Sequence, residues 1–146
     1  MKEISTEALI DAPPETVWRV LTDFYSYPNW SSFISRIEGS SERGGVLNVV
    51  MKDGKGKDRK FKPEVLVSEP EKEFRWKGKL GGMGWLFSGE HYFKIQKAGE
   101  GRTRLTHGEI FTGFMVPMLW RSLNTDTRQG FLEFNKSIKR RAESLT

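Results

Sequence analysis

The chain has 146 residues, a formal net charge of +5 and no cysteine. This length favours a single domain over residues 1–146, large enough to bury a hydrophobic core of its own. The lack of cysteine excludes disulfides and thiolate metal sites and fits a reducing compartment, so we expect a cytoplasmic protein. The charge excess is ordinary for a protein surface and does not by itself indicate a nucleic-acid partner.

The sequence shows no pattern of a signal peptide or of a membrane-spanning segment. Residues 1–6 are polar and lead directly into strand-like alternation, without the apolar stretch that a signal peptide requires. The longest apolar run, residues 114–120, is far shorter than the roughly 20 residues that cross a bilayer. We therefore expect no stable insertion into a membrane.

The first elements are a strand followed by two short helices. Apolar residues alternate over 4–10, which predicts a strand, and behind a double proline they take helical spacing over 17–24. Proline in a first helical turn costs no backbone hydrogen bond. Residues 24–30 predict a second short helix or turn, because the residue before Pro28 is disfavoured in helical geometry.

The centre of the chain is predicted to form about six antiparallel strands. In the stretch 73–80, apolar and charged residues alternate, which indicates a sheet with one face in water and hence an antiparallel sheet. Glycines in the segment 53–58 suit a hairpin turn. The predicted strands cover residues 34–38, 46–51, 59–69, 73–80, 86–97 and 102–112.

The last element is predicted to be one long amphipathic helix over residues 118–145. About 26 residues at 1.5 Å each make a helix roughly 39 Å long, enough to cross a whole sheet. The predicted fold is therefore an α+β helix-grip fold, in which a curved antiparallel sheet of about seven strands wraps around the C-terminal helix.

Three motifs resemble a known superfamily. They are Ile10-Asp-Ala-Pro-Pro-Glu-Thr-Val-Trp with the following Tyr27-Pro-Asn-Trp, the segment 109–117 with its Glu, Phe, Gly and Pro, and the segment 130–143 that begins Gly-Phe. Together they resemble the SRPBCC superfamily, which includes START proteins, birch-pollen allergens and polyketide cyclases/dehydratases. The resemblance covers essentially the entire chain. It implies a deep apolar cavity between sheet and helix, but it carries over no catalytic residue, because the superfamily shares none.

Strand parity places three polar residues on the inner face of the sheet. His91, His107 and Glu109 share the parity of Phe93 and Phe111. A carboxylate on an apolar wall is costly unless it is paired or protonated, and an imidazole is a suitable partner. The three residues are therefore candidates for acid/base catalysis or for hydrogen bonding to a ligand, and a buried structural pair is the third interpretation.

The other candidate ligand-binding residues are apolar or small side chains expected on the inner face of the sheet or of the helix. A loop at residues 81–84 lacks the pattern of a phosphate-binding loop and is predicted to form a rim. The basic hairpin at residues 52–62 has no interleaved stacking aromatic except Phe61, so we expect it to be solvated and predict no nucleic-acid partner. The full set of candidates is Trp76, His91, Phe93, His107, Glu109, Phe111, Leu123, Thr127, Phe131 and Phe134.

We expect neither a metal nor another cofactor, since two histidines and no cysteine leave few ligands. The sequence predicts that the protein binds or carries a small hydrophobic molecule, such as a lipid or polyketide, in a cavity of several hundred Å³ beside residues 123–134. Two alternatives stay open: a polyketide cyclase or dehydratase that uses the inner-face His and Glu residues, and a module that binds a protein partner. The sequence leaves the ligand, the oligomeric state and any catalysed reaction undecided.

Overall fold

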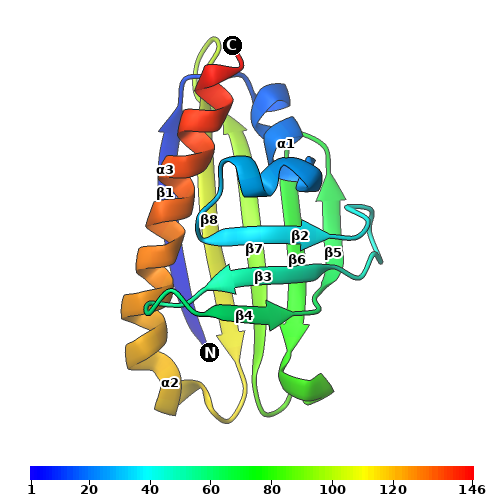
Figure 1. Cartoon of the computed structure of the whole chain (residues 1–146), viewed down its shortest axis with the longest axis vertical. Coiled ribbons are helices and arrows are strands. Elements are labelled where there is room, and N and C mark those ends of the chain that lie inside the picture. Colours follow the sequence, from blue (N-terminus) through cyan, green and yellow to red (C-terminus); the bar gives the residue numbers. More distant parts are fainter.

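A twisted antiparallel sheet forms one side of the molecule, and the C-terminal helix lies along it (Figure 1). The computed structural model describes all residues, 1–146. The chain begins with β1 (Lys2–Ile10), α1 (Pro14–Thr22) and the 3-10 helix η1 (Phe24–Asn29). The strands that follow are β2 (Ile34–Glu38), β3 (Asn48–Lys52), β4 (Asp58–Phe61), β5 (Glu64–Glu69), β6 (Glu73–Lys79), β7 (Ser88–Lys97) and β8 (Thr103–Thr112).

The eight strands form two sheets. The larger sheet has the order β1-β8-β7-β6-β5 and the smaller one the order β2-β3-β4, and all pairs are antiparallel. Figure 1 shows the smaller sheet crossing in front of β5 to β7, beside the C-terminal helix. The helix thus lies in a curved cover formed by both sheets.

The predicted strand over residues 59–69 is in fact two strands, and this prediction was wrong. β4 pairs with β3, whereas β5 pairs with β6, so the chain changes sheets at Lys62 and Pro63. Proline has no N–H for a ladder hydrogen bond, which makes the strand end there. This division raises the count from about seven strands to eight.

The C-terminal helix is continuous over three segments: α2 (Val116–Ser122), the π-helical turn η3 (Leu123–Thr127) and α3 (Arg128–Ser144). The prediction of a long helix over 118–145 is confirmed, and with it the helix-grip fold. The π turn was not predicted. Such turns insert one extra residue into a helical turn and are frequent at functional sites.

The helix packs on the sheets through one hydrophobic core. Phe131, Phe134 and Ile138 of α3 are fully buried in a cluster of 25 buried apolar residues. The rings of Phe131 and Phe33 lie 5.8 Å apart. Gly130 makes this approach possible, because a Cβ atom there would collide with the Phe33 ring. No helix is long and apolar enough to cross a membrane.

Candidate functional site

The two histidines of the chain contact each other inside the core. In the register of β7 and β8, His91 lies opposite Glu109 and Phe93 lies opposite His107, so the histidines are diagonal neighbours. Their Nε2 atoms are 2.7 Å apart, and both side chains are fully buried. This contact also means that the two Nε2 atoms do not converge on a shared metal ion.

A hydrogen-bonded chain continues from His107 to the C-terminal helix and to β1. His107 Nδ1 lies 2.9 Å from Asn135 Oδ1, and Asn135 Nδ2 donates to Thr6 Oγ1 at 2.9 Å. The Thr6 hydroxyl in turn donates to the backbone carbonyl of His107 at 2.7 Å. These bonds join three elements at one buried point.

The direction of each bond follows from the Thr6 hydroxyl. Its only hydrogen goes to the His107 carbonyl, so Thr6 accepts from the amide nitrogen of Asn135, and the amide oxygen faces His107. A neutral His107 then carries its proton on Nδ1 and accepts at Nε2 from the N–H of His91. His91 Nδ1 is therefore a buried acceptor, and no hydrogen-bond partner reaches it.

Both histidines are neutral at physiological pH. Burial away from water lowers the pKa of His91 to about 3. The same desolvation, with a smaller contribution from the neighbouring His91, holds the pKa of His107 well below its ordinary value. Neutral rings are what the directed hydrogen-bond chain requires.

Glu109 lies beside the acceptor that has no partner. Its Oε1 is 3.5 Å from His91 Nδ1, and its side chain is 17% exposed although it lies on the inner face. Gly89 makes room for it, because a Cβ there would collide with the carboxyl group. Desolvation raises the pKa of Glu109 to about 8. At neutral pH Glu109 is therefore a carboxylic acid with a proton to donate, and its contact with His91 is not an ion pair.

Aromatic rings fill the space around the histidines. The ring centroids of His107 and Phe131 are 4.2 Å apart, those of His107 and Phe93 are 4.6 Å apart, and those of His91 and Trp76 are 4.9 Å apart. Phe134 is also fully buried here. The predicted cavity beside residues 123–134 is thus absent at the level of the histidines, where side chains occupy the volume.

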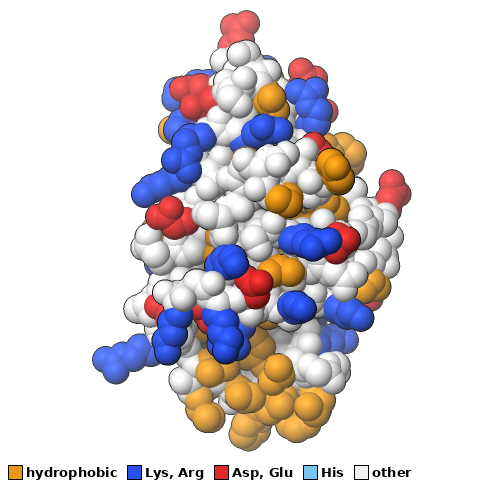
Figure 2. Space-filling view, in the orientation of Figure 1, with side chains coloured by type: hydrophobic (Ala, Val, Ile, Leu, Met, Phe, Trp, Pro, Cys, Tyr) orange, Lys and Arg blue, Asp and Glu red, His pale blue; other side chains and the backbone are white.

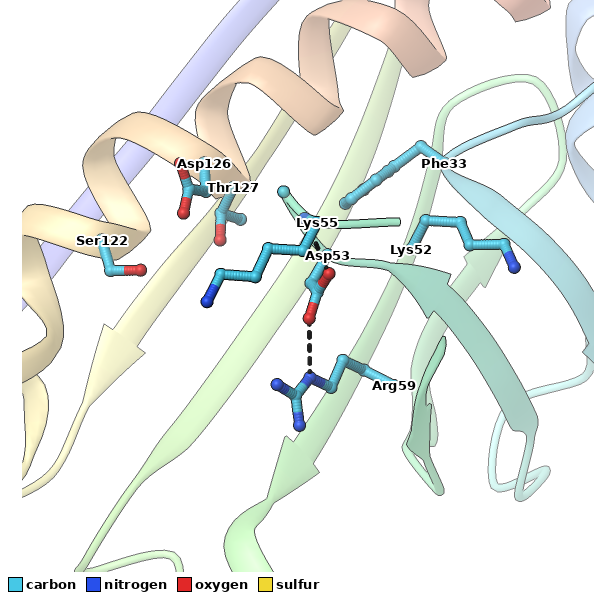
Figure 3. A pocket seen from close by; sticks show the side chains of 9 residues that line it. Phe33, Lys52, Asp53, Lys55, Arg59, Ser122, Asp126 and Thr127 are labelled. Atoms are coloured by element: carbon cyan, nitrogen blue, oxygen red, sulfur yellow. Dashed lines mark hydrogen bonds and ion pairs between the residues drawn. The ribbon is translucent and has the colours of Figure 1, made fainter. Parts of the chain in front are cut away.

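Open space lies further along the helix, at the π turn. A cleft of about 320 Å³ lies beside this turn and is bordered on its other side by the β3–β4 turn (Figure 3). The β3–β4 turn reaches the helix, since a Cβ at Gly54 would lie 3.1 Å from the carboxyl carbon of Asp126. The cleft is lined by Phe33, Lys52, Asp53, Gly54, Lys55, Arg59, Ser122, Asp126 and Thr127.

Asp53 fixes the shape of the turn on one side of this cleft. Its carboxylate accepts from the backbone N–H groups of Lys55 and Lys57 at 2.9 Å and from Arg59 Nε at 3.2 Å. These donors hold the pKa of Asp53 below its ordinary value, with the backbone bond from Lys57 contributing most. Figure 3 shows the Lys55 side chain extending toward the helix, whereas Arg59 of β4 points to the carboxylate of Asp53.

The structure places the predicted site residues in three settings. Trp76, His91, Phe93, His107, Phe131 and Phe134 form one closed cluster, whereas Glu109, Leu123 and Thr127 are partly buried, and Phe111 packs 6.0 Å from Phe87.

Sequence reasoning missed Thr6, Asn135 and Phe33. Thr6 has inward strand parity and Asn135 follows Phe131 by one helical turn, so their positions were readable as inner-face polar sites. Phe33 precedes β2 and belongs to no periodic segment, so no sequence pattern indicated where its side chain points.

Solved structures share this fold over nearly the whole chain. A START superfamily protein from Mycobacterium smegmatis has a TM-score of 0.73 at 18% identity, with 99% of each chain covered. The Zhui aromatase/cyclase from Streptomyces sp. R1128 has a TM-score of 0.79 at 13% identity, covering 97% of this chain and 93% of its own. Ara h 8.0201 has a TM-score of 0.72 at 16% identity and 98% coverage of each chain. At these identities the likeness shows the fold alone.

The sequence comparisons agree with the fold. No curated protein matches the chain significantly. Residues 1–143 match the family described as "Polyketide cyclase / dehydrase and lipid transport". The resemblance to the SRPBCC superfamily is thereby confirmed. A match over nearly the full length, on a helix-grip fold, shows that the chain belongs to this polyketide cyclase/dehydrase and lipid-transport family.

Proposed function

We propose that the protein binds a small hydrophobic molecule that carries a hydrogen-bond acceptor, and that the protonated carboxyl of Glu109 donates a hydrogen bond to this acceptor. The supporting observation is the state of Glu109, an inner-face carboxylic acid that is 17% exposed and has a pKa of about 8. Membership of a family described by polyketide chemistry and lipid transport supports the same class of ligand. A polar group on an apolar wall is the usual means of orienting such a ligand.

Three partly buried apolar side chains offer a surface for the apolar part of the ligand. Met51, Phe87 and Leu123 pack against the core but are only partly buried. We infer that the ligand covers these side chains and that it enters through the cleft at the π turn. Burial of this surface would provide most of the binding free energy, at about 25 cal/mol per Å² of apolar area.

A second candidate function is acid/base catalysis of the cyclase or dehydratase type. One observation favours it: an acid that is protonated at neutral pH lies 3.5 Å from an unprotonated imidazole nitrogen, at Glu109 and His91. Glu109 would give its proton to a carbonyl or hydroxyl oxygen of the substrate and, once ionised, would take a proton back, while the neutral His91 would orient its carboxyl group. A catalyst of this kind changes the mass or the absorption spectrum of its bound molecule, whereas a carrier releases it unchanged.

The binding proposal is tested with Nile red, a neutral apolar dye whose carbonyl oxygen accepts hydrogen bonds. If binding requires the protonated form of Glu109, affinity should fall about 10-fold between pH 7 and pH 9, since one pH unit above the pKa leaves about a tenth of the acid protonated. In Glu109→Gln the neutral amide still donates, so affinity should stay nearly constant over the same range. Fluorescence titrations at each pH measure both.

The matched control is Glu7→Gln, a change of the same type on the exposed side of β1. It should reproduce the pH dependence of the unmodified protein. All proteins are compared in a background that lacks Trp85 and Phe114, two exposed aromatic side chains that would offer the dye a nonspecific site. An affinity of the unmodified protein that is flat with pH, or an equal fall in Glu109→Gln, would overturn the proposal.

A further inference from the structure

One end of the molecule carries a cluster of exposed apolar side chains, which Figure 2 shows as the orange surface at the bottom. It belongs to the β6–β7 connection, to the β8–α2 connection and to the start of α2. We call it the apolar tip. Its side chains are between 43% and 82% exposed, and they are Leu80, Met83, Trp85, Phe114 and Met118.

Backbone hydrogen bonds hold the two connections of the apolar tip together. The N–H of Phe114 donates to the carbonyl of Trp85 at 3.0 Å, and the N–H of Met115 donates to the carbonyl of Leu86 at 3.0 Å. Gly113 has a φ of 118° and lies so close to Leu86 that a side chain there would collide with its carbonyl. The apolar side chains therefore project from a fixed support.

The two segments that form the apolar tip carry basic residues and no acidic ones. Residues 77–89 and 110–125 contain no Asp or Glu. Lys79 and Arg121 are exposed within these segments, and the Lys2 ammonium lies 5.4 Å from the centre of the Trp120 ring. Figure 2 also shows Lys and Arg side chains just above the orange surface. An apolar surface bordered by cations complements a partner that has an anionic outer layer over an apolar interior.

We propose that the apolar tip docks reversibly on an anionic lipid bilayer. Trp and Phe side chains partition to the headgroup level, and Trp85 and Phe114 are exposed enough to do so without unfolding. The cations Lys2, Lys79 and Arg121 would face the anionic headgroups, and the absence of acids removes the repulsion that such a surface otherwise imposes. Five side chains are enough for peripheral docking but do not form a membrane-spanning segment. This inference stands independently of the ligand proposal.

The test is co-sedimentation of the full chain with vesicles of phosphatidylcholine containing about 30% phosphatidylglycerol, against vesicles of phosphatidylcholine alone. The protein should bind the anionic vesicles at least about 10-fold more tightly, and the preference should weaken as salt screens the charges. The double variant Trp85→Ala/Phe114→Ala should lose at least about 10-fold in affinity for the anionic vesicles. Lys79→Gln/Arg121→Gln should lose the preference for anionic lipid.

The control is Tyr25→Ala, which removes an aromatic side chain that is 93% exposed on η1, outside the apolar tip. It should bind vesicles like the unmodified protein. Sedimentation equilibrium without lipid is measured on the same proteins. No binding to anionic vesicles, binding that survives in Trp85→Ala/Phe114→Ala, or a dimer that this variant dissociates would each overturn the proposal, the last by showing that a second copy covers the tip.

Discussion

At the scale of residues, the candidate site is defined by the positions of the protons on His107, His91 and Glu109. The bonds that run from Thr6 through Asn135 to His107 fix the tautomers of both histidines and leave an acceptor at His91 Nδ1. An unpaired buried acceptor destabilises a fold by about 1–3 kcal/mol, so a nearby donor is favoured. The nearest donor in the protein without ligand is the protonated carboxyl of Glu109, whose Oε1 lies 3.5 Å from His91 Nδ1.

The opposite pKa shifts predict a maximum of stability near pH 6.5. The pKa of Glu109 is raised from 4.5 to about 8, so the folded state keeps a proton that the unfolded state loses, and stability falls as pH rises through this range. The pKa values of His91 and His107 are lowered from 6.5, so stability is lost as pH falls below 6.5. Above pH 6.5 only Glu109 contributes, by roughly 2 kcal/mol up to pH 8.

Thermal melts between pH 5 and pH 9 check this expectation. The unmodified protein should lose about 4–8 °C in Tm between the maximum and pH 8. In Glu109→Gln the loss on the alkaline side should disappear, while the loss on the acid side remains. An alkaline loss of equal size in the variant would mean that another group is responsible and that Glu109 is ionised in the folded protein.

At the scale of elements, the contact between α3 and the chain before β2 depends on a single glycine. Gly130 lies where the Phe33 ring meets the helix, and this ring also packs edge-to-face against Phe131 and lines the cleft. Glycine inside a helix is about 1 kcal/mol less favourable than alanine. The packing of Phe33 therefore outweighs helix propensity at this position.

Gly130→Ala should destabilise the protein, contrary to its effect in an unhindered helix. The added methyl group collides with the Phe33 ring, and overpacking of this kind costs about 1–3 kcal/mol. Urea unfolding measures the change, with Gln129→Ala as the control at the exposed neighbouring position. A gain in stability for Gly130→Ala would show that Phe33 moves freely and that the contact does not hold the cleft in shape.

The elements could be predicted from the sequence to the extent that they follow a period. The alternation of residues 73–80 and the apolar face of the long helix gave the sheet and the helix-grip fold, and strand parity brought His91 next to Glu109. Pro63 is a local signal for the division between β4 and β5, but the prediction of one strand over residues 59–69 did not take it into account. The π turn and the approach of the β3–β4 turn to Asp126 depend on tertiary packing, which has no local pattern.

At the scale of the whole molecule, the closed and open regions are separated along the helix. Aromatic side chains close the volume around the histidines, whereas the cleft, the π turn and the partly buried Leu123 lie toward α2. The apolar tip includes Met118 of α2, about one helical turn from Ser122 of the cleft. A protein that docks by this tip would bring its cleft near the membrane surface, from which an apolar ligand can be taken up.

Native mass spectrometry of the protein purified from its source organism tests the central claim, that the protein binds a small apolar molecule. The unmodified protein should carry such a molecule, Leu123→Trp should lack it because the larger ring fills the space, and Leu132→Trp, on an exposed face of α3, should retain it. Only unliganded mass in all three proteins, under conditions that preserve bound Nile red, would contradict the claim, as would an adduct that persists unchanged in Leu123→Trp.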